Sequence, residues 1–298
     1  MTSPAGQAAL HKAQVLYRMA TLLSHHTLPP TIHVAAARCN HSTLQLNQLH
    51  TLDTCAIQGN PNINTQNDYF LLSLFRAVSS HVLTTGSNLR AEPHLHFPPL
   101  ADVDVTLAAL RKDWGFQHSS PTPVVLTRAA DGIDFNAIFF QKDKQGAVPV
   151  LLVQEHEAAQ VRLRLSQVVG AAATVVGCGT TTLDTPSTAI EYMRMHLQAT
   201  RISIECGPSV TSGLYAANKI GALSLSVLRR NPHKVGSRVE GRSDGSIPVI
   251  EQDATFQNAQ FVHWMGQFVQ VSSAVEKEQD IKEKDDAFQW TYDLFVRG

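Results

Sequence analysis

The chain of 298 residues has few cysteines and no long apolar run. Its four cysteines lie at positions 39, 55, 178 and 206, and no two of them show Cys-x-x-Cys spacing. We therefore interpret them as reduced thiols, and we expect no metal site among the scattered histidines. No run approaches the roughly 18 apolar residues of a membrane span. No signal peptide is recognisable either, which predicts a soluble protein without membrane contact.

The sequence also lacks a charge excess of either sign, with 24 basic and 25 acidic residues. Such a balance gives no field that would attract nucleic acid, so a small molecule or another protein is the expected partner. The first acidic residue is Asp53. An acid-poor start is typical of organellar transit peptides, but a neutral helix that packs on the protein has the same composition. The compartment is therefore left open between the cytoplasm and an organelle.

Residues 7–24 have the apolar periodicity of an amphipathic helix, which ends before the prolines at 29 and 30. The positions expected on its apolar face include Leu10, Ala13, Val15 and Leu16. We expect residues 1–42 to form an N-terminal helical extension and residues 43–298 to form the main domain.

Strand-like and helical segments alternate through this main domain. Strands are predicted at 43–49, 80–86, 123–128, 148–154, 173–179 and 222–228, and helices at 66–79 and 187–200. This alternation predicts an α/β fold built on one main sheet.

The segment "IECGP" at 204–208 predicts a strand, a tight turn and the start of a helix that ends near Asn218. Gly207 lets a ligand approach the backbone closely, and Pro208 suits the first helical turn. The unpaired N–H groups and the dipole of such a helix favour a phosphate group above the turn.

The longer segment "IECGPSVTSGLYAANKIGALSLSVL" resembles the reductase domain of riboflavin biosynthesis, which has a dihydrofolate-reductase-like fold. Two further motifs of that family have counterparts in the same order, in "LQLNQLHTLDTCAIQG" at 44–59 and "LTTGSNLRAEP" at 83–93. The resemblance covers roughly residues 43–298. It implies a mixed, mainly parallel sheet flanked by helices on both faces, and a homodimer. The zinc signature of the deaminase that is often fused to this reductase is absent from the sequence.

The resemblance implies a reaction in which NADPH delivers hydride to a ribosylaminopyrimidine phosphate or a similar small substrate. By motif position, Asp53 and Glu205 would contact the substrate. The positions that would contact NADPH are Asn88, Glu92, Gly207, Pro208 and Ser209. The resemblance assigns no catalytic residue.

Several positions depart from the family pattern. Thr54 and Cys206 replace glycines, and the arginine that would hold the substrate phosphate has no counterpart, since His94 and His96 stand near its place. Neutral imidazoles bind phosphate less well than a bidentate guanidinium. Two hypotheses follow: an NADPH-dependent reductase, or a catalytically drifted pseudoenzyme of the same fold that serves as a structural or assembly subunit of a larger complex.

Three residues keep two interpretations each. Asp53 contacts the substrate or caps its own turn. Glu205, at the end of an apolar strand, must be satisfied by a ligand or by nearby backbone N–H groups. Cys206 is a reactive thiol near a helix N-terminus or a small packed residue in place of glycine.

Overall fold

The computed structural model describes residues 2–17, 23–40, 43–46, 66–179, 186–230, 249–250, 268–275 and 288–297. The helices are α1 (Pro4–Tyr17), α3 (Gln66–Ala77), α4 (Gly86–Ala91), α5 (Leu100–Val103), α6 (Val105–Asp113), η1 (Ile138–Phe140), η2 (Glu155–Glu157), α7 (Ala158–Ser166), α9 (Pro186–His196) and α10 (Pro208–Ala216). The strands are β1 (Thr31–Asn40), β2 (Thr43–Leu46), β3 (His81–Thr85), β4 (Thr122–Leu126), β5 (Val150–Gln154), β6 (Thr174–Cys178), β7 (Ile202–Ile204), β8 (Ala222–Arg230), β9 (Val249–Ile250), β10 (Phe268–Val275) and β11 (Phe288–Arg297).

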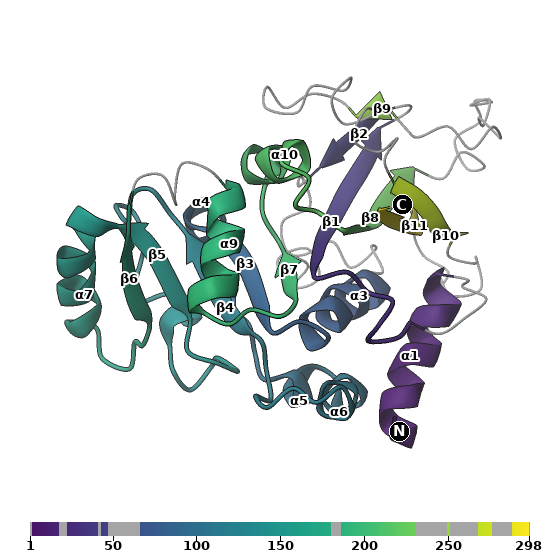
Figure 1. Cartoon of the computed structure of the whole chain (residues 1–298), viewed down its shortest axis with the longest axis horizontal. Coiled ribbons are helices and arrows are strands. Elements are labelled where there is room, and N and C mark those ends of the chain that lie inside the picture. The colour runs from purple at the N-terminus through teal and green to yellow at the C-terminus, as the bar shows by residue number, and fades with distance from the viewer. Residues whose placement is uncertain are drawn as a thin grey trace.

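The strands of the described residues form one mixed sheet in the order β10-β11-β8-β1-β7-β3-β4-β5-β6. Pairing is parallel from β8 through β1, β7, β3, β4 and β5 to β6. The antiparallel pairs are β8 with β11, β11 with β10, and β1 with β2. The α/β fold with a mixed, mainly parallel sheet is thus confirmed (Figure 1).

Helices cover both faces of the sheet, as expected. One core joins α9 and α10 to residues such as Leu83 of β3, and Figure 1 shows α9 crossing this face. On the other face, α1, α3 and α6 pack in a second core and α7 packs in a third, which includes Val82. Neighbouring residues of β3 therefore point into opposite cores, and all five of its residues are buried. This two-sided burial explains why β4 (TPVVL) and β5 (VLLVQ) are mainly apolar along their length rather than alternating.

Helix α1 packs into the second core through Ala9, Leu10, Ala13 and Tyr17, all of which are buried. The Tyr17 hydroxyl also forms a hydrogen bond with Ser224 Oγ on β8, at 2.6 Å. Val15 is 60% exposed. Its expected place on the apolar face is therefore wrong, because the buried stripe passes through Leu10, Ala13 and Tyr17 at helical spacing.

The expected boundary at residue 43 divides elements that the structure joins. Strand β1 was assigned to the N-terminal extension, yet it pairs in parallel with both β7 and β8 near the centre of the sheet. We therefore correct the start of the sheet to Thr31. The segment "TIHVAAARC" does not by itself specify its two parallel neighbours, because β7 and β8 come from residues more than 160 positions later in the chain.

Two buried arginines anchor the carboxyl end of α3. Arg111 Nη1, on α6, donates to the carbonyls of Ala77 and Ser79 at 3.0 and 2.5 Å. Arg201 Nη1 donates to the carbonyl of Val78 at 2.9 Å, and its Nη2 donates to that of His25 at 2.7 Å. The last carbonyls of a helix have no partner within the helix and carry its negative dipole end, so they favour such cations. These bonds tie α3 to α6, to β7 and to the segment before β1.

Helix ends follow local sequence signals. Asp104 caps α6 by accepting a hydrogen bond from the N–H of Thr106 at 2.8 Å. Asn218 follows α10 with a φ of 57°, the left-handed conformation that asparagine tolerates better than most residues. The predicted end of α10 near Asn218 is thus confirmed.

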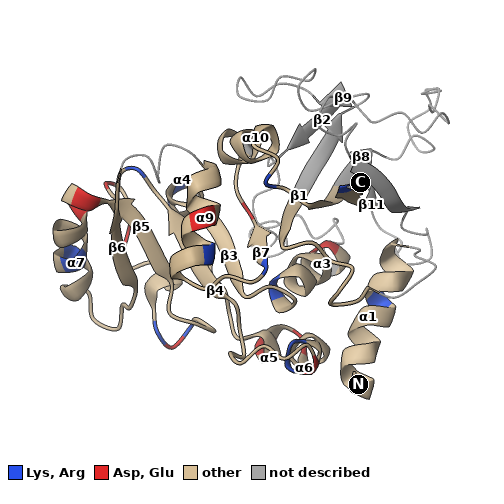
Figure 2. Ribbon diagram, in the orientation of Figure 1, with Lys and Arg blue, Asp and Glu red and all other residues tan. Residues whose placement is uncertain are grey.

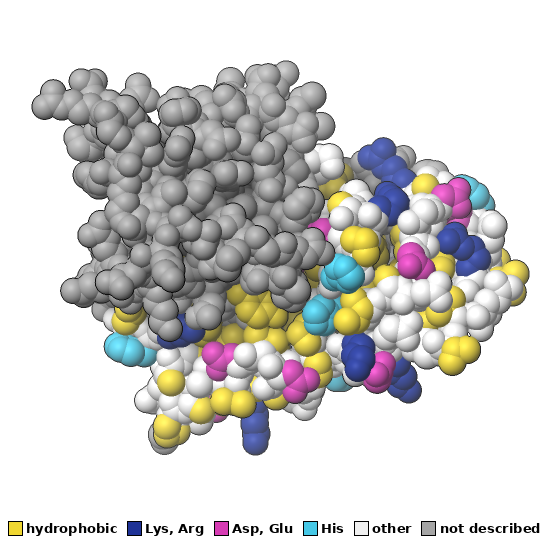
Figure 3. Space-filling model, turned by 180° about the vertical axis from the view of Figure 1, so that it is seen from behind, with side chains coloured by type: hydrophobic (Ala, Val, Ile, Leu, Met, Phe, Trp, Pro, Cys, Tyr) yellow, Lys and Arg dark blue, Asp and Glu magenta, His cyan; other side chains and the backbone are white. Residues whose placement is uncertain are grey.

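The described surface shows no separation of charge by sign, since basic and acidic residues are interspersed along the ribbon (Figure 2). Seen from behind, hydrophobic side chains are mixed with polar and charged ones outside the grey region (Figure 3). No helix of the described ranges has the length and apolar character needed to span a bilayer.

Burial of His33 predicts a loss of stability in acid. Its Nδ1 lies 2.9 Å from the Tyr215 hydroxyl in the core, and desolvation lowers its pKa from 6.5 to about 3. Between these two values the unfolded chain binds the proton and the folded chain does not, so stability falls as the pH falls. We expect the urea midpoint to decrease from about pH 7 to about pH 4, and to decrease less steeply in His33→Asn. Equal pH slopes for both proteins would contradict this assignment.

Candidate functional site

The carboxyl ends of parallel strands meet at one edge of the sheet, and the two predicted motifs lie side by side there. The N–H of Glu205, directly after β7, donates to the carbonyl of Leu83 on β3 at 2.8 Å. The turn from β7 to α10, residues 205–208, therefore lies beside the start of α4, which follows β3. Ligands of open α/β sheets commonly bind outside this edge.

The first turn of α10 has the features of an anion site. Gly207 is the N-cap residue, with a φ of −66°, and no side chain caps the helix. Pro208 is the first helical residue, and Ser209 after it is exposed. The strand, turn and helix predicted from "IECGP" are thus confirmed. The uncapped end directs its positive dipole outward at the carboxyl edge of the strands.

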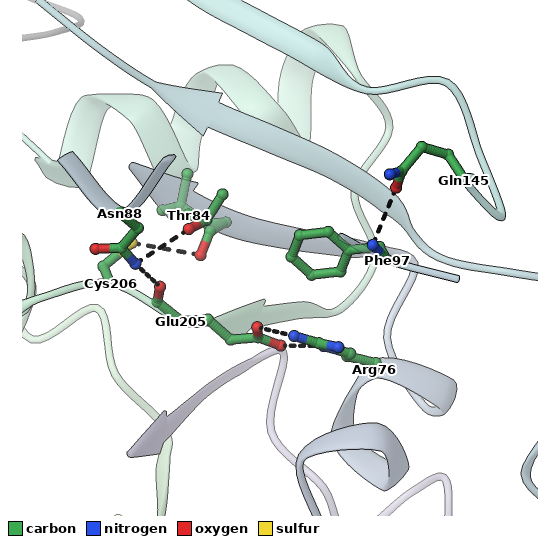
Figure 4. Close-up of polar contacts among 8 residues, drawn as sticks. Arg76, Thr84, Asn88, Phe97, Gln145, Glu205 and Cys206 are labelled. Atoms are coloured by element: carbon green, nitrogen blue, oxygen red, sulfur yellow. Dashed lines mark hydrogen bonds and ion pairs between the residues drawn. The ribbon is translucent and has the colours of Figure 1, made fainter. Parts of the chain in front are cut away.

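Glu205 forms a bidentate ion pair with Arg76 of α3 (Figure 4). Arg76 Nε donates to Oε1 at 2.9 Å, and Nη2 donates to Oε2 at 2.8 Å. The two side chains are only 7% and 10% exposed, in the order Arg76 and Glu205. From the sequence, the expected partner of this carboxylate was a ligand or nearby backbone N–H groups. The partner in the structure is instead a guanidinium. A carboxylate oxygen has more than one lone pair, so Glu205 can accept a further hydrogen bond while it is paired with Arg76.

Asn88 joins the two motifs through its side-chain amide. Its Nδ2 donates to the carbonyl of Glu205 at 2.9 Å and to Thr84 Oγ1 at 3.2 Å (Figure 4). Its backbone N–H donates to Thr85 Oγ1, the N-cap of α4, at 3.2 Å. Both amide hydrogens thus bind the protein itself, and the acceptor Oδ1 is the side-chain atom that these contacts do not use.

Cys206 is a packed residue rather than a reactive one. Its side chain is buried, and Sγ donates a weak hydrogen bond to the carbonyl of Leu83 at 3.3 Å. Desolvation, with a smaller effect from the charge of Glu205, raises the pKa of this thiol. The thiolate needed for nucleophilic chemistry is therefore disfavoured, which supports the packing interpretation of its place in the motif.

The remaining predicted residues are less closely grouped. Glu92 is the C-cap of α4, where its N–H donates to the carbonyl of Asn88 at 2.8 Å. His94 is exposed, and its carbonyl lies 3.0 Å from His96 Nδ1. Asp53 lies outside the described residues. Ligand contacts of Asp53, Asn88, Glu92, Glu205, Gly207, Pro208 and Ser209 stay predictions.

Sequence reasoning missed the contact of Arg76 with Glu205, and it did not single out Arg128. The need of a buried carboxylate for a partner was a signal for the first, but Arg76 is separated from Glu205 by 129 positions. Arg128 is exposed two residues after β4, at the same edge of the sheet. Its position at the end of a parallel strand was the available signal, since the predicted segment 123–128 already contained it.

No protein-family model and no curated protein matches this sequence. The structure is similar to a pyrimidine reductase-like protein from Corynebacterium diphtheriae, with a TM-score of 0.58, 18% identity and coverage of 96% of this chain and 99% of that one. It also aligns with the riboflavin biosynthesis reductase Rib7 of Saccharomyces cerevisiae, with a TM-score of 0.44, 12% identity and coverage of 98% and 97%. For RibD of Acinetobacter baumannii the TM-score is 0.46, the identity 12% and the coverage 91% and 58%.

The first of these similarities shows the fold, and the other two are too weak to add to it. The chain is a divergent α/β domain with a pyrimidine-reductase-like fold. Fold similarity at this identity does not transfer a reaction, which has to be argued from the site.

Removal of the Glu205 charge is expected to destabilise the protein strongly. Glu205→Gln leaves the Arg76 guanidinium buried without its counter-charge, which costs about 3–5 kcal/mol of the free energy of unfolding. Glu191→Gln is the matched control, because Glu191 binds Lys219 at the same 2.8 Å but is 53% exposed. Exposed pairs contribute little, so we expect no measurable loss there. Urea titration of both variants measures the free energy of unfolding. Similar losses of stability in the two variants would contradict the claim that burial makes the Glu205 pair the costlier one to break.

Proposed function

We propose that the protein is an NADPH-dependent reductase of a small phosphorylated substrate, related to the riboflavin-pathway pyrimidine reductases. The observation that carries this proposal is the uncapped N-terminus of α10, with Gly207 as its cap, beside the carboxyl ends of β7 and β3. A backbone site of this kind binds phosphate through N–H groups and the helix dipole. The similarity in fold to a pyrimidine reductase-like protein supports the choice of reaction class.

The residues at this edge fit a phosphorylated dinucleotide. Gly207 carries no side chain to block the approach of a phosphate, and the exposed Ser209 places a hydroxyl in the first turn. Arg128, at the end of β4, adds a guanidinium on the same edge, where a 2′-phosphate would distinguish NADPH from NADH. When bound, NADPH supplies the hydride, and the protein supplies position and charge complementarity.

Glu205 is the group that we propose to bind the substrate. Its carboxylate, already held by Arg76, is an acceptor only, so the complementary substrate group is a donor such as a sugar hydroxyl. This chemistry agrees with the ribose of a ribosylaminopyrimidine phosphate. Asp53 is proposed to lie beside the same substrate, as its motif position implies.

Addition of NADPH to the purified protein is expected to raise its melting temperature, and NADH is expected to raise it less. A ligand that binds only the native state stabilises it by an amount that grows with the ligand concentration, about 2.7 kcal/mol at a hundred times Kd. Differential scanning fluorimetry up to millimolar cofactor measures the shift. An unchanged melting temperature would exclude cofactor binding and favour the alternative, a structural or assembly subunit of the same fold.

Gly207→Trp is expected to abolish this shift by filling the approach to α10. The φ of Gly207 is −66°, which any residue adopts, so the variant tests ligand access rather than backbone strain. Circular dichroism confirms that the variant is folded. NADPH binding of wild-type strength in the folded variant would disprove the assignment of the turn.

Arg128→Ala is expected to weaken NADPH binding about tenfold or more and to change NADH binding less than about twofold, because only NADPH offers a charged phosphate to the guanidinium. Arg194→Ala is the matched control. Arg194 is also exposed, but it lies in the last turn of α9, which runs back toward the opposite edge of the sheet. Fluorescence titration measures both dissociation constants. If Arg128→Ala weakens the binding of NADPH and NADH equally, Arg128 does not bind the 2′-phosphate.

A further inference from the structure

Arg76 stands out because it connects a helix behind the sheet to the turn at the candidate site. It lies in the last turn of α3, and its two parallel hydrogen bonds reach the carboxylate of Glu205, two residues before the cap of α10. Two bonds between a planar guanidinium and a planar carboxylate fix direction as well as distance. A single point charge at the same place would fix the distance but not the direction.

The guanidinium of Arg76 is itself held in place. Its central carbon lies 4.3 Å from the centroid of the Phe97 ring, which is buried. The N–H of Phe97 donates to Gln145 Oε1 at 3.0 Å, which secures the segment that carries the ring (Figure 4). Stacking on one side and the carboxylate on the other restrict the rotamers of a side chain that is otherwise flexible.

The element that carries Arg76 is equally fixed. Arg111 and Arg201 bind the carbonyls that follow directly after it, at residues 77–79. On the far side of the turn, Asn88 Nδ2 holds the carbonyl of Glu205. Arg76 of α3 thus binds the side chain of Glu205, and Asn88 of α4 binds its backbone carbonyl.

We propose that Arg76 is a positioning residue, which through Glu205 sets the orientation of the β7–α10 turn for the binding of a phosphate group. Energetics support this role over simple stabilisation. A buried ion pair contributes little net stability, because the cost of desolvating both charges offsets their attraction. Its geometric effect is larger, since a shift of Glu205 moves Gly207 and the first N–H groups of α10. This inference rests on the proposed function for the identity of the ligand.

The test separates positioning from stability with a pair of substitutions. Arg76→Met alone leaves the buried carboxylate unpaired, and it is expected to lower the melting temperature strongly. Arg76→Met combined with Glu205→Gln removes both charges, and it is expected to recover most of that loss. If the pair positions the turn, the double variant still binds NADPH about tenfold or more weakly than wild type, measured by fluorescence well below its melting temperature. Arg76→Lys keeps the charge but not the fork, and it is expected to bind as weakly.

Arg164→Met is the control for removal of an arginine elsewhere, from a pair whose side chains are 33% exposed for Arg164 and 95% for its partner. Arg164 also comes from a helix, pairs with a carboxylate, Asp131, at 3.8 Å and lies over an aromatic ring, Phe135, at 4.9 Å. It belongs to α7, next to β6 and away from the turn. We expect the NADPH dissociation constant of this variant to stay within about twofold of wild type. If NADPH binding is weakened to a similar extent in Arg164→Met and in the double variant, the cause is general destabilisation. That result would overturn the proposal.

Hydrogen exchange tests the positioning without any cofactor. In the double variant we expect faster amide exchange in residues 205–213, and unchanged exchange in the residues of α7. Wild-type NADPH affinity or wild-type exchange in the double variant would each overturn the role of Arg76. If the wild-type protein binds no NADPH but the exchange of the turn depends on Arg76, the proposed cofactor is wrong and the positioning role stands.

Discussion

The carbonyls at the end of α3, which have no partner within the helix, are the constraint on which much of the described structure depends. These groups are buried, so they need donors, and Arg111 and Arg201 provide them from α6 and from the residue before β7. Both guanidinium groups are planar and carry several N–H groups, so each reaches more than one carbonyl. Arg201 also holds the segment around His25, which leads into β1. One helix end thus fixes an N-terminal segment, a neighbouring helix and the entry to a central strand.

This arrangement places the candidate site on a rigid support. Arg76 lies one residue before the carbonyls that Arg111 and Arg201 bind, and it reaches Glu205 across the face of the sheet. The candidate site is therefore connected to α3, a helix whose end is held by two arginines, through a bidentate contact. Sites built on fixed elements keep their geometry better than sites on loops. The three buried arginines of the described residues, Arg76, Arg111 and Arg201, are of this kind, since each binds carbonyls or a carboxylate.

Two interpretations of the protein follow from the same features. The turn at Gly207, the exposed Ser209 and the exposed Arg128 lie at the carboxyl edge of the strands, where the proposed function requires a phosphate to bind. The replacement of glycine by Cys206 is compatible with that surface, because the thiol points into the core toward Leu83 and not toward a ligand. The departure from the family motif that was hardest to explain from the sequence is thus a packing change. Cys206 therefore does not distinguish a reductase from a drifted relative of the same fold.

The sequence by itself determined the local elements and their class. Apolar runs predicted the strands β3 to β6, and "IECGP" predicted a strand, a turn through Gly207 and a helix ending near Asn218, because these features depend on neighbours within a few residues. Only the tertiary structure decided which strands are neighbours and which side chains contact each other. It placed β1 in the middle of the sheet, gave Glu205 its partner from α3, and used both amide hydrogens of Asn88 inside the protein. Apart from the bond between Asn88 and Thr84, these contacts join positions more than 100 residues apart, and no local pattern specifies which buried groups form pairs.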